Sequence, residues 1–156
     1  AEDRTKMETS PHFVLGIFGN FFGIALFVVP AITFFSVVRR GSTDEYSGIP
    51  YVAALSNCLV YTWYGLPIVT PNNVLVSSVN GCGAVLETLY ISLYLAYSPT
   101  KYRMKILSLF IGVLVLFAAI VAVSFFLFHG SAREMFVGVI GVALSVAMFA
   151  SPLSIM

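Results

Sequence analysis

Charged side chains are scarce in this sequence. Only 10% of its 156 residues are Asp, Glu, Lys or Arg, whereas 59% are hydrophobic. So much apolar sequence with so little charge is typical of membrane proteins and excludes an ordinary soluble domain. The basic residues sit in short loops and form no further patch, so the sequence predicts no nucleic-acid partner.

Motifs of enzymes are also missing. The sequence contains no HExxH, no phosphate-binding loop and no GxSxG, which excludes the commonest hydrolase, kinase and metalloprotease signatures. Its two cysteines, Cys58 and Cys82, have no histidine at metal-ligand spacing, so neither a zinc site nor a disulfide framework is indicated. We therefore expect a protein that is not an enzyme and that holds no metal or cofactor.

What the sequence does contain is five apolar segments. Each has about 19–26 residues, and about 20 helical residues cross the hydrocarbon core of a bilayer. No strand-like alternation runs through them, which argues against a β-barrel. The sequence thus predicts an all-α, polytopic membrane protein. Its helices are expected at about 13–38, 51–69, 74–96, 106–128 and 131–156.

Two of these segments repeat one another. An offset of 122 positions aligns Gly16–Phe34 with Gly138–Met156, and five residues of the first stretch recur in the second: Gly16, Gly19, Ala25, Phe27 and Pro30. Matched glycines and a matched proline are hard to explain by chance similarity of apolar helices. An internal repeat built on a proline-broken membrane helix is typical of carriers.

The basic residues predict the orientation. The loops after the first and third segments hold Arg39, Arg40, Lys101, Arg103 and Lys105, whereas those after the second and fourth hold only Arg133. The positive-inside rule places the first pair of loops in the cytosol and the tail, residues 1–12, outside or in a lumen.

The number of crossings then predicts parallel repeats. The first and fifth segments are four crossings apart, so they point the same way. The architecture is three helices (13–97), a cytosolic loop and linker helix (98–130), and the first helix of a second repeat (131–156).

Polar side chains lie on the second and third segments. Asn57, Tyr61 and Tyr64 are spaced i, i+4 and i+7, so they share one helix face, and Asn80 follows on the next segment. Amides match the hydroxyls of a sugar, and aromatic rings offer flat faces to its C–H side. Asparagines of this kind also tie helices together in membranes. The pattern alone leaves both interpretations open.

Two further features carry a functional and a structural interpretation. Glu87 is the one ionisable side chain well inside a segment, either a proton relay or a carboxyl with a structural role. Pro30 removes the hydrogen bond to the Leu26 carbonyl and bends its helix, and Pro152 repeats this in the last segment. Such prolines act as hinges or as static kinks.

The sequence as a whole resembles the SWEET (MtN3/saliva) sugar transporter family, plant type. The segments GIFGN, LFVVPAITF, SGIPY, SNCLVYTWYGLP, VNGCGAVLETLY and MFASPLSIM match the family's signatures in order between Phe13 and Met156. The resemblance implies passive, bidirectional sugar transport, hexose favoured, by alternating access between two parallel three-helix bundles. It also implies that the third helix of each bundle lies between the first two.

Three groups of residues match functional positions of that family. The sugar-facing group is Asn57, Tyr61 and Asn80; the gate group is Tyr64 and Gly65; the hinge group is Pro30, Pro50 and Pro152. The implied partners are a mono- or disaccharide, the lipid bilayer and other family members in a homo- or hetero-oligomer. The resemblance favours the plasma membrane, with the vacuolar membrane as the alternative.

The sequence departs from the family in length. It stops after the fifth predicted helix, and the family's remaining pocket and gate residues are expected in two further helices. A different class of function is therefore a truncated, non-transporting membrane isoform that associates with full-length relatives. A channel is a third possibility, but no ring of matched polar groups is visible.

Overall fold

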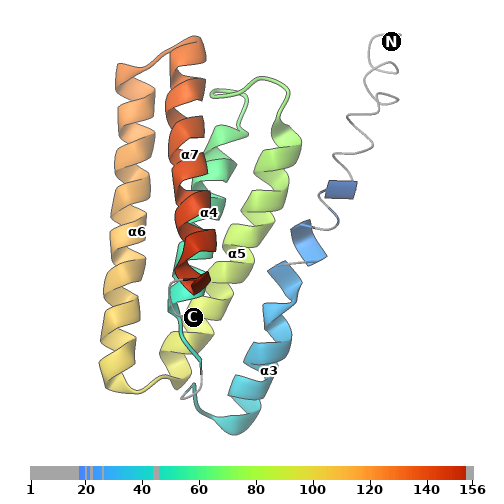
Figure 1. Cartoon of the computed structure of the whole chain (residues 1–156), viewed down its shortest axis with the longest axis vertical. Helices are drawn as coiled ribbons and strands as arrows, with labels where there is room; N and C mark the ends of the chain where they lie inside the picture. Colours follow the sequence, from blue (N-terminus) through green and yellow to red (C-terminus); the bar gives the residue numbers. More distant parts are fainter. Residues whose placement is uncertain (1–17, 20, 22, 26, 44–45, 154–156) are drawn as a thin grey trace.

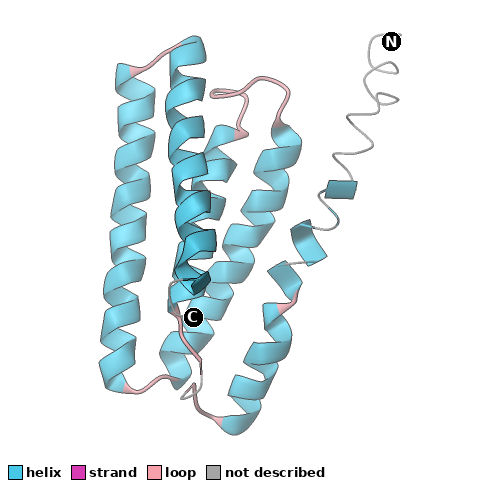
Figure 2. Cartoon of the chain, viewed as in Figure 1, coloured by secondary structure: helices cyan, strands magenta, loops and turns pink. Residues whose placement is uncertain are grey.

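The computed structural model describes residues 18–153 with gaps at 20, 22, 26 and 44–45 (Figure 1). Five long helices follow one another: α3 (Pro30–Arg40), α4 (Ile49–Tyr64), α5 (Val74–Tyr97), α6 (Thr100–Leu127) and α7 (Gly130–Leu153). The described residues of 18–28 are also helical and are separated from α3 by a turn at Val29. No strand occurs in this part of the chain (Figure 2), which confirms the all-α prediction.

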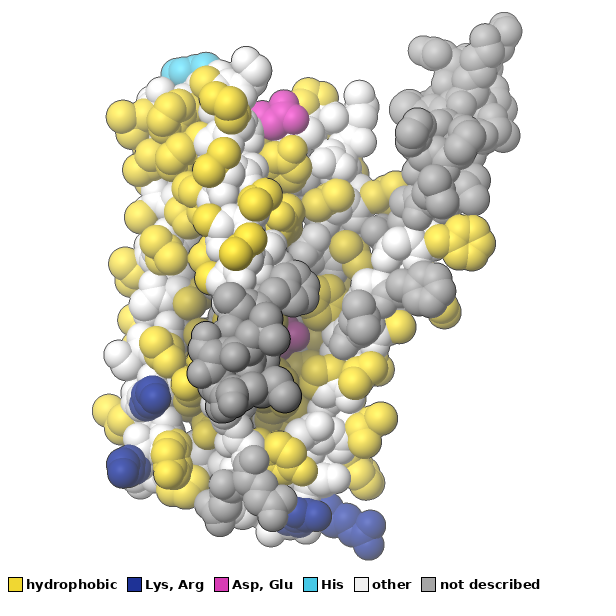
Figure 3. Space-filling model, viewed as in Figure 1, with side chains coloured by type: hydrophobic (Ala, Val, Ile, Leu, Met, Phe, Trp, Pro, Cys, Tyr) yellow, Lys and Arg dark blue, Asp and Glu magenta, His cyan; other side chains and the backbone are white. Residues whose placement is uncertain are grey.

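Four stretches are long and apolar enough to cross a bilayer, namely Gly23–Arg40, Val74–Tyr97, Thr100–Leu127 and Gly130–Met148. The helix α6 is the most apolar of them, with a mean hydropathy of 3.1. Hydrophobic side chains also cover the flanks of the molecule in the space-filling view (Figure 3). The chain is therefore an integral membrane protein.

Two helices differ from their predicted bounds. The helix α4 ends at Tyr64, five residues before the predicted end at residue 69. Pro67 disfavours helical backbone at Leu66, and the chain continues through turns in which the Thr70 N–H donates to the Leu66 carbonyl. The helix α6 begins at Thr100, six residues before the predicted start at residue 106. Its basic first turns are good helix formers, which apolar patterning does not register.

The helices are not packed in chain order. The helix α5 packs closely against both α3 and α4, whereas α3 reaches α4 only through side chains such as Phe34 and Tyr51. This is the order that the family resemblance implies for the first bundle, with the third helix in the middle. The helix α4 also contacts α6 and α7, so it lies at the centre of the described bundle (Figure 1).

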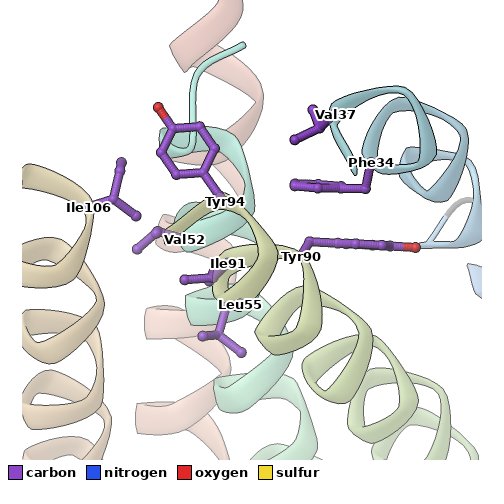
Figure 4. Packing of buried hydrophobic residues seen from close by; sticks show 8 residues of the cluster. All are labelled: Phe34, Val37, Val52, Leu55, Tyr90, Ile91, Tyr94 and Ile106. Atoms are coloured by element: carbon purple, nitrogen blue, oxygen red, sulfur yellow. The ribbon is translucent and has the colours of Figure 1, made fainter. Parts of the chain in front are cut away.

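Aromatic side chains join α3, α4 and α5 near one end of the bundle. The rings of Phe34 and Tyr90 are stacked with centroids 4.9 Å apart, and Tyr51 meets Phe34 edge-on at 4.9 Å. Figure 4 shows the stacked rings of Phe34 and Tyr90 together with Leu55 and Ile91 of the same buried cluster. Because lipid tails are as apolar as these side chains, such close packing, rather than escape from water, holds the helices together.

A second contact region joins α4, α6 and α7 near the other end. Val60, Ile120 and Val137 are buried there. The indole N–H of Trp63 on α4 donates to the Ser124 hydroxyl on α6 at 2.9 Å. A hydrogen bond inside the bundle satisfies two groups that would otherwise be costly at membrane depth.

The exposed basic residues lie at one end of the bundle. The α3–α4 and α5–α6 connections lie at one end, and the α4–α5 and α6–α7 connections lie at the other (Figure 1). On the face shown in Figure 3, the Lys and Arg side chains gather at the first of these ends. The exposed residues Arg39, Arg40, Lys101, Arg103 and Lys105 belong to it.

Arg133, at the opposite end, is buried and has a structural role. Its Nε donates to the carbonyls of Ser124 at 2.9 Å and Phe128 at 3.0 Å. Its Nη1 and Nη2 donate to Ile68 at 3.0 Å and Phe125 at 3.2 Å. The guanidinium thus satisfies carbonyls that the end of α6 leaves without partners and connects them to the α4–α5 loop. It is a structural cation, unlike the exposed basic residues at the other end.

Candidate functional site

The polar face of α4 lies against α7. The Ser145 hydroxyl of α7 is 2.9 Å from Oδ1 of Asn57 and 3.4 Å from the hydroxyl of Tyr61. It is also 3.0 Å from the carbonyl of Gly141. A serine hydroxyl has one proton, so Ser145 donates to only one of these three oxygen atoms at a time. The Tyr61 hydroxyl can also donate its own proton to the Ser145 oxygen. The predicted face of α4 is thus part of a polar seam between α4 and α7.

Two glycines let α7 approach this face closely. A Cβ added to Gly141 would lie 3.2 Å from the ring of Tyr61, and one added to Gly138 would lie 3.4 Å from the ring of Tyr64. These glycines are the ones that recur at the 122-residue offset. The α4–α7 seam, defined by Asn57, Tyr61 and Tyr64 on one side and Gly138, Gly141 and Ser145 on the other, is therefore built partly from the repeat itself.

Asn80 does not join this seam. Its Nδ2 donates to the carbonyl of Val76 in its own helix at 2.9 Å, and the side chain is half-buried. No hydrogen bond connects it to Asn57 or Tyr61 among the described residues. The α4–α5 contact nearby is made by Ser77, whose hydroxyl donates to the Thr62 carbonyl at 2.9 Å. The structure therefore brings Asn57, Tyr61 and Tyr64 together and leaves Asn80 apart.

The two predicted gate residues, Tyr64 and Gly65, lie at the C-terminal end of α4. Gly65 is buried, and a Cβ there would lie 2.5 Å from the backbone nitrogen of Ser77 and 2.9 Å from the carbonyl oxygen of Asn73. Only glycine fits so close to another backbone. Tyr64 borders an open groove of about 430 Å³ along α7, together with Glu134 and Met135.

A break in the first membrane segment occurs at Pro30. Pro30 is the first residue of α3, and Val29 before it forms a turn. The Tyr90 hydroxyl on α5 donates to the carbonyl of Phe27 at 2.9 Å, and the backbone N–H of Ala31 interacts with the same hydroxyl. In an unbroken helix that N–H would bond to that carbonyl directly. Tyr90 therefore bridges the break.

The other two prolines that were predicted to be hinges are placed differently. Pro50 is the second residue of α4, where its missing N–H costs nothing. Pro152 lies in the last turn of the α7 backbone, and its side chain is outside the described residues. The carbonyl of Leu26, expected to lose its partner at Pro30, is also outside them. Of the three predicted hinge prolines, Pro30 is the one that the described residues place between two helical stretches.

Glu87 is enclosed by the first bundle. It is 3% exposed, and its Oε2 has no hydrogen-bond partner in the described part of the chain. The buried Cys58 on α4 and Tyr90 on α5 interact with it electrostatically. The described residues contain no cluster of His, Cys, Asp and Glu that would hold a metal ion. In the described part of the chain, no hydrogen bond links Glu87 to the α4–α7 seam.

Sequence reasoning missed Ser145, Tyr90 and Arg133. Ser145 had a signal, because it shares a helix face with the repeat glycines Gly138 and Gly141 at i, i+3 and i+7. Arg133 was counted only as a loop charge. Nothing in the sequence distinguishes Tyr90 from the other tyrosines of its segment, since its partner lies 63 residues away.

Comparisons with known proteins identify the relatives of this chain. The family model described as "Sugar efflux transporter for intercellular exchange" matches residues 13–102. The chain is 46% identical over 145 residues to the bidirectional sugar transporter SWEET1 of Arabidopsis thaliana, covering 93% of this chain and 59% of the relative. It is 46% identical over 151 residues to SWEET1b of Oryza sativa subsp. indica, covering 96% and 58%.

A solved structure is similar as well. A eukaryotic SWEET transporter superposes with a TM-score of 0.86 at 42% identity, covering 92% of this chain and 67% of that one. The chain spans about three fifths of the length of the curated relatives it matches. The names of these relatives describe transport and no enzymatic reaction.

Proposed function

Because this chain belongs to the SWEET (MtN3/saliva) family, we propose that it supplies the first bundle, the linker helix and the first helix of the second bundle of a passive, bidirectional sugar transporter. The first bundle is residues 13–97, the cytosolic loop and linker helix are 98–130, and the second bundle begins at 131. The relatives that support this are named as bidirectional sugar transporters.

The observation that carries the proposal is the α4–α7 seam. Asn57 and Tyr61 belong to the first repeat and Ser145 to the second, and their polar atoms meet. A sugar hydroxyl is both a donor and an acceptor. It can therefore replace the partner that each of these groups loses when the seam opens, so that no buried group is left unpaired. We infer that the sugar separates α4 from α7 at this point and that rocking of the two bundles carries it across.

A hexose is the favoured substrate. The ring of Tyr61 lies 3.2 Å from the position that a Cβ at Gly141 would take, which limits the width available beside Asn57. An aromatic ring also gives the C–H face of one pyranose unit a flat surface. Asn80 remains a proposed sugar ligand, because its bond to Val76 uses one of its two amide protons.

Replacing Asn57 with leucine should lower hexose uptake by about ten-fold or more. Leucine keeps the volume but leaves the Ser145 hydroxyl without its amide partner, a loss of roughly 1–3 kcal/mol. Uptake is measured in cells that express residues 1–156 joined to the C-terminal part of the Arabidopsis relative. Surface expression is the control. Near-normal uptake would make Asn57 a helix tie and not a sugar ligand.

Cysteine labelling tests the orientation. We propose that the end carrying Arg39 and Arg40 is cytosolic and that the N-terminus is outside, since Arg133 is a buried, structural cation. In a Cys82→Ser background, cysteine at Ser42 should resist an impermeant maleimide in intact cells and cysteine at Asn73 should react. The reverse pattern would overturn the orientation.

A further inference from the structure

The first membrane segment is packed differently on the two sides of Pro30. In its second half, the helix α3, the side chains of Phe34 and Val37 are only 3% and 1% exposed and belong to the buried cluster with α4 and α5. In its first half, the described residues of 18–29, Phe18 is 59% and Val28 is 49% exposed. The buried packing therefore anchors α3, whereas the first half carries large apolar side chains that the described residues do not cover.

The backbone hydrogen bonds of the segment change at the break. Pro30 has no N–H to donate. The Val29 N–H donates to the Ala25 carbonyl, four residues back, at 3.2 Å. The Ile32 N–H donates to the Val29 carbonyl, three residues back, at 3.3 Å. Because the regular ladder is interrupted here, the angle between the two halves depends on which neighbouring groups contact the break.

The hydroxyl of Tyr90 on α5 contacts the break. It donates to the Phe27 carbonyl at 2.9 Å and interacts with the backbone N–H of Ala31. The Tyr90 ring is only 5% exposed and stacks on Phe34 with the two planes 4° apart. Figure 4 shows the Tyr90 hydroxyl pointing toward α3, while the hydroxyl of Tyr94, one turn further along α5, points away from it. A side chain that inserts into the backbone ladder in this way produces a defined bend.

A second contact holds the segment at the same residue. A Cβ added to Gly83 of α5 would lie 2.7 Å from the ring of Phe27 and 2.9 Å from Sγ of Cys58. The Phe27 ring is therefore packed against the α5 backbone, while the carbonyl of the same residue accepts the Tyr90 hydroxyl. The ring contact fixes the position of Phe27, and the hydroxyl bond acts on the direction in which the backbone passes it.

We propose that Tyr90 is a positioning residue, whose hydroxyl sets the direction of the first half of the segment relative to α3. The stretch from residue 18 to Pro30 is about 18 Å of helix at ~1.5 Å per residue. A change of ~10–20° at the break moves the far end of this stretch by about 3–6 Å. Without the hydroxyl, the Ala31 N–H and the Phe27 carbonyl can pair directly, so the bend decreases.

Distances between pairs of spin labels measure this bend in the full chain. The labels are attached to introduced cysteines in a Cys82→Ser background, in which the remaining Cys58 is buried. Tyr90→Phe keeps the ring and its stacking but removes the hydroxyl. We expect this change to shift the distance of the first-half pair by about 3–6 Å and to leave the α3 pair unchanged. The labelled positions, all of them exposed, are Phe18 and Phe126 for the first-half pair and Phe35 and Met104 for the α3 pair.

Tyr94→Phe is the matched control. It removes a tyrosine hydroxyl from the same helix, and the ring is similarly buried, but this hydroxyl points away from the break. Both distances should stay as in the wild type. An unchanged first-half distance in Tyr90→Phe would overturn the proposal. Equal shifts in the two variants, or equal shifts in the two label pairs, would also overturn it, because they would indicate general loosening of the helices.

Sugar uptake tests the consequence for transport, which rests on the proposed function. The helix α7 repeats the first segment and packs against α4, so the first segment should meet the second bundle in the corresponding way. In residues 1–156 joined to the C-terminal part of the Arabidopsis relative, Tyr90→Phe should lower glucose uptake by about three-fold or more, and Tyr94→Phe should not. Normal uptake in Tyr90→Phe would contradict a role in transport. If no version transports glucose, the proposed function fails, and the label distances still decide whether Tyr90 sets the bend.

Discussion

Alanine at position 65 is expected to abolish sugar uptake by the completed transporter. The added Cβ would lie 2.5 Å from the backbone nitrogen of Ser77 and 2.9 Å from the carbonyl oxygen of Asn73. Both atoms belong to the backbone, so no side-chain rotation relieves the clash, and the end of α4 must move away from α5. We expect a loss of several kcal/mol of stability, above the roughly 1–3 kcal/mol of ordinary overpacking.

Thermal unfolding and uptake are measured together for this variant. The matched control is Gly112→Ala, because a Cβ at Gly112 in α6 meets nothing within 4 Å. Alanine is the better helix former by about 1 kcal/mol, so this control should unfold at the same or a slightly higher temperature. Normal uptake and stability in Gly65→Ala would show that α4 and α5 do not approach as closely as described.

Replacing Arg133 with alanine is the second change of large expected effect. It removes four carbonyl hydrogen bonds that join the end of α6 to the α4–α5 loop. Hydrogen bonds to a charged donor contribute about 1.5–3 kcal/mol each, but bonds of one group are not additive. A total loss of about 3 kcal/mol lowers the melting temperature of a chain of this size by about 10 °C.

Two further variants separate hydrogen bonding from charge. Arg133→Lys keeps the charge but has one nitrogen in place of three, so its melting temperature should lie between those of the wild type and Arg133→Ala. Arg39→Ala removes an exposed arginine and should shift melting by less than about 2 °C. If Arg39→Ala and Arg133→Ala behave alike in detergent-solubilised protein, the carbonyl contacts contribute nothing measurable.

The parts of the fold that could be predicted rest on local patterns. Apolar length indicated the helices, and the i, i+4, i+7 spacing of Asn57, Tyr61 and Tyr64 indicated one face of α4. The repeat glycines Gly138 and Gly141, which the sequence singled out only as part of a repeat, lie on the face of α7 that meets it. Each of these signals lies within a few turns of one helix, where geometry follows directly from spacing.

The parts that could not be predicted depend on contacts far apart in the chain. Trp63 and Ser124 are 61 residues apart, and Asn57 and Ser145 are 88 apart. The central position of α5 followed from family resemblance and not from spacing. The early end of α4 was missed because hydropathy does not register the backbone restriction that Pro67 imposes.

The break at Pro30 gains a specific interpretation from Tyr90. The Tyr90 ring is held by stacking on Phe34, and its hydroxyl bridges Phe27 and Ala31 across the break. A proline break whose free backbone groups are held by the neighbouring helix has a defined geometry. In the proposed cycle, the first segment would bend at this point while the rest of the bundle moves as a unit.

The most direct test of a sugar site in the α4–α7 seam is protection of a cysteine at position 145. The chimera with the Arabidopsis relative carries Ser145→Cys and Cys82→Ser, and the rate of maleimide labelling is measured with and without glucose. Our account predicts that saturating glucose slows labelling several-fold, and that a cysteine at Gly112 on α6 is unaffected. Equal labelling rates with and without glucose, in a chimera that still transports the sugar, would contradict the account.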